Sequence, residues 1–222
     1  PAALGDTLTW TLDTETGELL VKGTATEIKF DKNETGGVNW NNMGVVPWYA
    51  HGNSIKSVKV TAPITKISRY SFAYLTNLEK VVLPTTLVNW DGEYNYFGGC
   101  SKLHSLAFGA EYGVDNVIDL TNLTDCTKGG CQTFEEVGNG KTLTVLTPKN
   151  GAPVLMDSKF LGKAAKVTVY VTEGSDMEKV VDKFIEKADG KDYCANIEKV
   201  YYELDWAPVD TTEGTTSTLV WL

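Results

Sequence analysis

The sequence predicts a β-rich repeat solenoid of α/β type, in which similar short turns of chain stack and share one interior. Three observations predict it: an aromatic and aliphatic pattern recurs at nearly constant spacing, a hairpin pattern precedes it, and an amphipathic helix pattern follows it. With 222 residues, 42% of them hydrophobic, the chain is long enough to bury a core. One turn cannot bury its own apolar face, so the turns are expected to stack.

The repeat has the form aromatic-x-x-φ-x-x-φ-x-x-φ-x-φ, where φ is an apolar residue. Its copies begin at Tyr49, Phe72, Phe97, Phe134 and Phe160. The first two spacings are 23 and 25 residues, and the third is 37 residues, which equals 25 plus an insertion of 12. The last two apolar positions of each copy alternate as in a short strand, so they face one interior. We therefore expect the repeated phenylalanines to be aligned in the core.

The segments before the repeats predict an N-terminal β cap over residues 1–48. Apolar residues alternate up to a polar turn at residues 13–17, which ends in glycine, and residues 18–23 form the returning half of a hairpin. The repeat domain is expected over residues 49–205, and residues 206–222 are a tail or the start of a further segment.

A helix is predicted over residues 175–189, inside the last part of the repeat domain. Ser175 and Glu178 have the spacing of a capping box, apolar residues follow with helical periodicity, and Gly190 lies just beyond the end. This amphipathic helix is expected to close the C-terminal end of the stack.

Charge and composition exclude some classes of partner. The net charge is −9, with 29 acidic residues and 20 basic ones, and Arg69 is the single arginine. Nucleic acid binding requires clustered lysine and arginine, so no nucleic acid partner is expected, and anionic membrane surfaces are disfavoured for the same reason. Apolar stretches such as residues 45–50 are far shorter than the about 18 residues of a membrane helix. No transmembrane segment is expected.

The cysteines and histidines predict no metal site and no catalytic site. Four cysteines without a C-x-x-C pair, and only two histidines, do not assemble a four-ligand zinc site. Cys126 and Cys131 either form a disulfide or are small buried side chains, and spacing alone leaves both open. Cys100 and His104 suggest a nucleophile and base, but the repeat places Cys100 inside and His104 outside, so we expect no catalytic residue and no cofactor.

The unit from Ile64 to Pro84, ITKISRYSFAYLTNLEKVVLP, resembles the repeat of BspA-type leucine-rich repeat proteins of bacterial surfaces. Residues 46–49 are similar to that family's entry into its first repeat, and residues 152–175 resemble the closing unit of related gut-bacterial proteins. The long spacing before Phe134 departs from the pattern. The resemblance implies a leucine-rich-repeat stack on an exported protein, secreted or on the cell surface, with a binding face and no enzyme activity.

The first functional hypothesis is a non-enzymatic binding or adhesion module for a host or neighbouring-cell protein or another macromolecule. Its candidate surface is the exposed row of strand positions, which contains two basic residues, Lys59 and Lys80, and three threonines, Thr142, Thr144 and Thr168. Such a row would act by surface complementarity and not by chemistry.

The alternative is a carbohydrate-binding module or part of a carbohydrate-active protein. Trp90, Tyr94 and Tyr96 gather in the loop that carries a two-residue insertion, and flat amphipathic rings suit sugar stacking. Trp90 also fits the core position that Ile67 occupies one unit earlier, which would leave Tyr94 and Tyr96 exposed.

Overall fold

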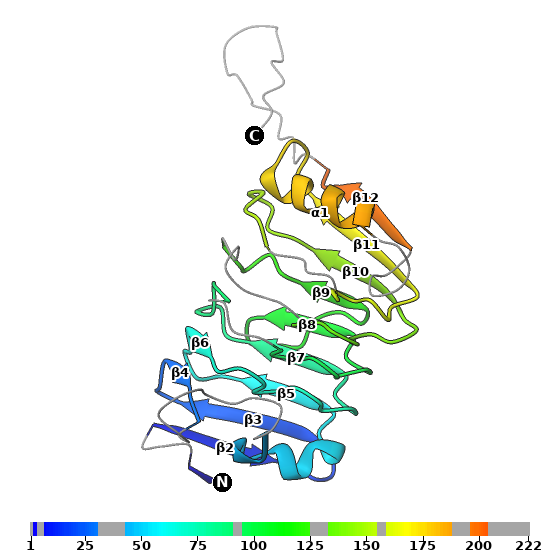
Figure 1. Cartoon of the computed structure of the whole chain (residues 1–222). Coiled ribbons are helices and arrows are strands. Elements are labelled where there is room, and N and C mark those ends of the chain that lie inside the picture. The colour runs from blue at the N-terminus through cyan, green and yellow to red at the C-terminus, as the bar shows by residue number, and fades with distance from the viewer. Residues whose placement is uncertain are drawn as a thin grey trace, which may run out of the picture.

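The computed structural model shows a β-solenoid of about five turns with little helix, as the repeat predicts (Figure 1). The structure describes residues 2–3, 7–30, 43–90, 95–124, 133–154, 159–187 and 196–203. The chain advances along the stack from the hairpin strands at the N-terminal end to β12 and helix α1 at the C-terminal end.

One sheet runs the length of the solenoid, with ten strands in the described residues. Its strands, in their order across the sheet, are β1 (Ala2–Ala3), β2 (Leu8–Leu12), β3 (Glu18–Gly23), β5 (Ser57–Val60), β7 (Lys80–Leu83), β8 (Ser105–Phe108), β9 (Val117–Asp119), β10 (Thr142–Leu146), β11 (Lys166–Val171) and β12 (Ile197–Tyr201). The first three strands pair antiparallel, and every later pair is parallel. Parallel pairing is what a solenoid requires, because each turn returns the chain to the same edge.

The remaining elements are short. Strands β4 (Glu27–Ile28) and β6 (Lys66–Ile67) pair in parallel as a second sheet, and η1 (Met43–Val45) and η2 (Tyr49–Ser54) are 3₁₀ helices. The single α-helix of the described residues is α1 (Asp176–Lys187). The predicted hairpin is present as β2 and β3, and β3 continues the main sheet into β5.

An aromatic ladder runs through the core, and it confirms the predicted alignment of the repeated phenylalanines. Successive rings have centroids 5.3 to 6.2 Å apart. The ladder consists of Trp48, Phe72, Phe97, Phe134, Phe160 and Phe184. Aliphatic residues line up beside it: Val58 pairs with Val81, which pairs with Leu106, and all three are buried. Burial of each such side chain contributes about 1.5–3 kcal/mol.

The first repeat contradicts the predicted alignment at one residue. Tyr49, assigned to the first aromatic position, is 40% exposed, whereas its neighbour Trp48 is fully buried and stacks on Phe72 at 5.5 Å. The Trp48 indole Nε1 donates a hydrogen bond to the Ser71 carbonyl at 2.7 Å. The larger ring fills the core position and satisfies its only donor there, and η2 begins at Tyr49 with that side chain outside.

The 12-residue insertion forms an additional strand. Strand β9 lies between β8 and β10, with Leu106 opposite Ile118 and Ile118 opposite Val145. All three side chains are buried, so the inner column continues without a break across the long spacing.

Helix α1 begins where the capping pattern predicts. The Ser175 Oγ accepts a hydrogen bond from the Glu178 N–H at 3.1 Å, and the Glu178 carboxylate accepts one from the Gly174 N–H at 2.7 Å. Phe184 on α1 packs edge-on against Phe160 and thereby extends the aromatic ladder. The helix lies beside β11 and β12 (Figure 1).

Glu178 links α1 to β12 and should make stability depend on pH. Its Oε1 accepts hydrogen bonds from the Lys199 ammonium at 2.7 Å and the Tyr201 hydroxyl at 2.5 Å, and chiefly the Lys199 bond lowers the pKa of this carboxyl from 4.5 to about 2. A lowered folded-state pKa stabilises the protein above pH 4.5, and this contribution is lost as the pH falls toward 2.

The variant Glu178→Gln lacks this titrating carboxyl. In urea unfolding between these two pH values, its free energy of unfolding should therefore depend less on pH than that of the wild type. An unchanged profile would contradict the assigned role.

Candidate functional site

The outer face of the main sheet carries the lysines and threonines that the sequence analysis selected. One row across the sheet contains Lys80, Thr144 and Thr168. Its residues, in strand order, are Lys80, Ser105, Val117, Thr144 and Thr168, and each lies opposite the next. Lys59 instead lies opposite Val82, and Thr142 lies opposite Lys166. The five residues therefore share one face, where the register of the strands distributes them over three adjacent rows.

A short segment covers the N-terminal half of this face. Residues 109–116, named the strap here, connect β8 to β9, and the Tyr112 hydroxyl donates a hydrogen bond at 2.9 Å to the Glu18 carboxylate on β3. In the sheet order, β5 and β7 lie between β3 and β8, so the strap spans these strands. Val82, on the outer side of β7, is fully buried. Burial also raises the pKa of the Tyr112 phenol.

The strap supplies acidic partners for both candidate lysines. The Lys80 ammonium lies 2.7 Å from the Asp115 carboxylate, and the Lys59 ammonium lies 3.8 Å from the Glu111 carboxylate. The hydrogen bond from Lys80 lowers the pKa of Asp115 below its usual value. A ligand at these lysines would have to compete with the strap. The 12-residue insertion and its acids were visible in the sequence, but their place over the sheet was not.

Asp115→Asn should loosen the strap, because it removes the negative partner of Lys80 while preserving side-chain size. The expected result is faster amide hydrogen exchange in residues 110–116 than in the wild type. Asp176→Asn is the matched control, since Asp176 forms a similar exposed pair with Lys179 at 2.7 Å on α1. Equal exchange of the strap in the two variants would show that this ion pair does not hold it.

The C-terminal half of the outer face carries no such cover from the strap. Thr142 is exposed, and Thr144, Thr168 and Tyr170 are partly exposed; these four residues are named the open face here. Tyr170 packs against Tyr202 with ring centroids 5.7 Å apart, which fixes the aromatic ring at this position. The open face thus presents hydroxyl groups and one ring on a rigid parallel sheet.

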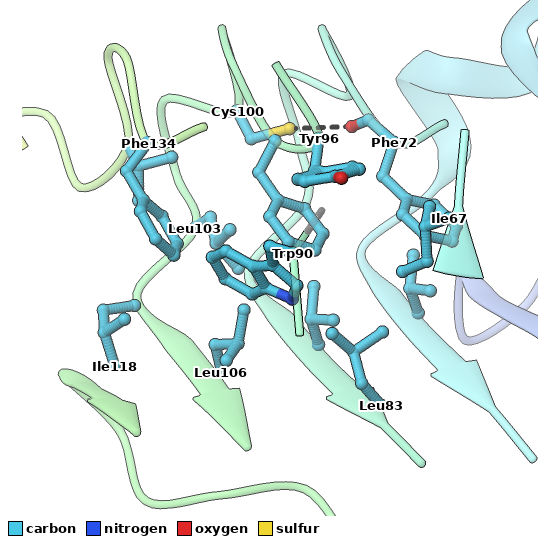
Figure 2. Packing of buried hydrophobic residues seen from close by; sticks show 14 of the residues in the cluster. Ile67, Phe72, Leu83, Trp90, Tyr96, Cys100, Leu103, Leu106, Ile118 and Phe134 are labelled. Atoms are coloured by element: carbon cyan, nitrogen blue, oxygen red, sulfur yellow. Dashed lines mark hydrogen bonds between the residues drawn. The ribbon is translucent and has the colours of Figure 1, made fainter. Parts of the chain in front are cut away.

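Trp90 and Tyr96 lie in the core and not on a ligand-binding loop. Trp90 is 5% exposed and Tyr96 is 2% exposed, and Figure 2 shows both among the buried residues of the ladder. Their ring centroids are 5.7 Å apart, and Trp90 lies 5.5 Å from Phe134. The core interpretation of Trp90 is confirmed, and the expected exposure of Tyr96 is wrong, because its ring fills space against Trp90. Tyr94 lies outside the described residues.

Cys100 and His104 do not form a catalytic pair. The Cys100 thiol is fully buried, its Sγ lies 3.0 Å from the Phe72 carbonyl (Figure 2), and burial raises its pKa to about 12. The His104 Nε2 lies 3.7 Å from Asp115 of the strap. The thiol is therefore a core group, as the repeat predicts. Cys126 and Cys131 fall outside the described part of the chain.

The described residues contain exposed aromatic side chains that the sequence analysis did not select. Tyr74 is 44% exposed and Tyr201 is 42% exposed, in addition to Tyr49. Tyr74 follows Phe72 by two residues, a position that is glycine in the next turn, Gly99. An aromatic residue where the next repeat has glycine was the sequence signal that could have indicated the exposed ring of Tyr74.

Within the described ranges, no group of three or more His, Cys, Asp or Glu side chains is placed to hold a metal ion, and no helix has the length and apolar character to cross a membrane. Comparisons with protein families, characterised proteins and solved structures found no match.

Proposed function

We propose that this chain is a non-enzymatic binding or adhesion module, exported to a bacterial cell surface or secreted, that recognises a protein through the open face. The single observation that supports it best is the outer side of a parallel sheet on which Thr144 and Thr168 lie side by side, with Tyr170 in the adjacent row. Ordered hydroxyls and a fixed tyrosine suit contact with a protein surface, since tyrosine is enriched at interface centres.

The proposal includes a BspA-like leucine-rich-repeat architecture. The β2–β3 hairpin would act as its N-terminal cap, and α1 as its C-terminal cap, because a stack of turns exposes apolar surface at both ends unless other elements cover it. The packing of Phe184 against Phe160 supports this role for α1. On the N-terminal side, Trp10 of the hairpin packs edge-on against Trp48 at 6.2 Å.

The strap moves the proposed contact away from the lysines. Lys59 and Lys80 already interact with strap carboxylates, so they offer little unbalanced positive charge to a partner. The proposed contact surface is therefore the threonine and tyrosine part of the face, where a partner needs hydrogen-bonding groups and not a strong negative charge.

The test measures binding to a panel of purified extracellular-matrix and serum proteins by interferometry. The doubly substituted variant Thr144→Glu with Thr168→Glu should weaken binding to any captured protein by at least about tenfold. The bound protein would cover the two new carboxylates and leave them without hydrogen-bond partners. Thr65→Glu introduces the same group at an exposed threonine beside β6 and should leave the affinity unchanged. Binding that tolerates both open-face substitutions, or no binding to any protein, would refute the proposal.

A further inference from the structure

Two tyrosines in one turn adopt a backbone conformation that disfavours them. Tyr70 and Tyr74 have φ values of 56° and 57°, in the left-handed region. One turn later the equivalent positions are Asn95 and Gly99, residue types that tolerate this region. The repeat itself imposes this conformation, since Glu136, two repeat units after Tyr74, also has a φ of 64°. A tyrosine is costly there, and strained residues gather at functional sites, so the strain directs attention to what these rings contact.

Gly99 provides the surface on which the Tyr74 ring lies. A Cβ atom built on Gly99 would be 2.5 Å from Tyr74 Cδ1 and 2.9 Å from Cε1, so only glycine leaves room for the ring. The Tyr74 N–H also donates to the Gly98 carbonyl at 2.8 Å. The ring is thus fixed against the next turn while 44% of the residue remains exposed.

Charged groups lie beside this ring. Glu135 and Lys159 form an ion pair at 2.6 Å, and the Glu135 carbonyl accepts a hydrogen bond from the Gly99 N–H at 2.9 Å. Burial, and then the charge of Glu135, raises the pKa of the Tyr74 phenol. The Tyr74 phenol therefore lies close enough to the Glu135–Lys159 pair for their charges to act on it, and both charged side chains are partly accessible to solvent.

We propose that the surface around Tyr74, Glu135 and Lys159 is a saccharide-binding site. The apolar C–H face of a pyranose would stack on the exposed ring, and its hydroxyls would donate to the Glu135 carboxylate and accept from the Lys159 ammonium. Phe72 and Cys100, which are close to Tyr74 and Gly99 in the sequence, lie on the side of the core away from the strands (Figure 2), and we place the site on that side. It is independent of the open face.

A saccharide fits this surface better than a protein does. Protein hot spots need a desolvated apolar centre surrounded by further contacts, whereas the neighbours of Tyr74 named above are ionised. A sugar ring combines one apolar face with many hydroxyls at its rim. One aromatic side chain with charged groups beside it matches this arrangement. Glu135 and Lys159 already form an ion pair. When saccharide hydroxyls replace the water around this pair, both charged groups keep hydrogen-bond partners.

The experiment screens the purified chain on an array of defined oligosaccharides of glucose, galactose, mannose and N-acetylglucosamine, followed by affinity electrophoresis. Tyr74→Ala should weaken binding to the best oligosaccharide by at least about tenfold, while Tyr74→Phe, which keeps the stacking ring, should stay within about threefold. Tyr74→Gly removes the ring and also relieves the left-handed strain, so it gives a folded variant that must show the same loss as Tyr74→Ala.

Tyr49→Ala is the matched control, because Tyr49 is a comparably exposed tyrosine, at 40%, outside the proposed site. Its sugar affinity should equal that of the wild type, and the same holds for the open-face variant with Thr144→Glu and Thr168→Glu. No oligosaccharide binding, binding that is unaffected in Tyr74→Gly, or loss of protein binding alone in that variant would each overturn the saccharide site. The first two results would leave the open face untouched, whereas loss of protein binding in Tyr74→Gly would show that the protein contact includes Tyr74.

Discussion

Phe97→Ala should lower the free energy of unfolding by about 3–5 kcal/mol, as large-to-small substitutions of buried aromatic residues do. Phe97 is fully buried in the middle of the aromatic ladder, with centroids 5.8 Å from Phe72 and 6.2 Å from Phe134. Removing it leaves a cavity between two turns and breaks the stacking on both sides. Urea unfolding monitored by circular dichroism measures the effect.

The control for this prediction is Tyr49→Ala. Tyr49 occupies the corresponding place in the sequence repeat, yet it is 40% exposed, so its removal should cost about 1 kcal/mol or less. Similar losses for the two variants would show that sequence position in the repeat, and not membership of the ladder, decides the energetic role.

Gly23→Ala should destabilise the N-terminal hairpin by about 3 kcal/mol, at the upper end for single substitutions. Gly23 has a φ of +142°, and a Cβ atom there would be 2.0 Å from the Thr7 carbonyl oxygen. That oxygen is held in place by the N–H groups of Thr24 and Ala25, so it cannot move away without breaking both hydrogen bonds. The start of β2 must therefore separate from the end of β3.

Tryptophan fluorescence can follow this separation, because Trp10 on β2 lies 6.2 Å from Trp48 in the ladder. Gly44→Ala is the control, since a Cβ atom at Gly44 meets no atom within 4 Å. We expect a fluorescence change and a lower unfolding midpoint for Gly23→Ala only. If both variants unfold like the wild type, the hairpin backbone is not held as described.

The candidate sites show where reasoning from the sequence is weakest. Trp90 and Tyr96 lie on either side of the two-residue insertion in the sequence, which suggested a loop, but their rings pack together in the core. Lys59 and Lys80 were placed on the correct face, because strand alternation alone determines which side a residue faces. Their acidic partners come from the strap, whose path over the sheet depends on contacts between distant strands.

The periodic spacing of Phe72, Phe97 and Phe134 was sufficient to determine the solenoid and its shared core, because a stack of similar turns needs only local periodicity and burial of one face. The tertiary structure decided that Trp48 and not Tyr49 starts the ladder, and that the inserted residues add β9 and a strap. These outcomes depend on which ring fills a given space and which charges meet across several strands, and such competition between distant groups leaves no periodic signal in the sequence.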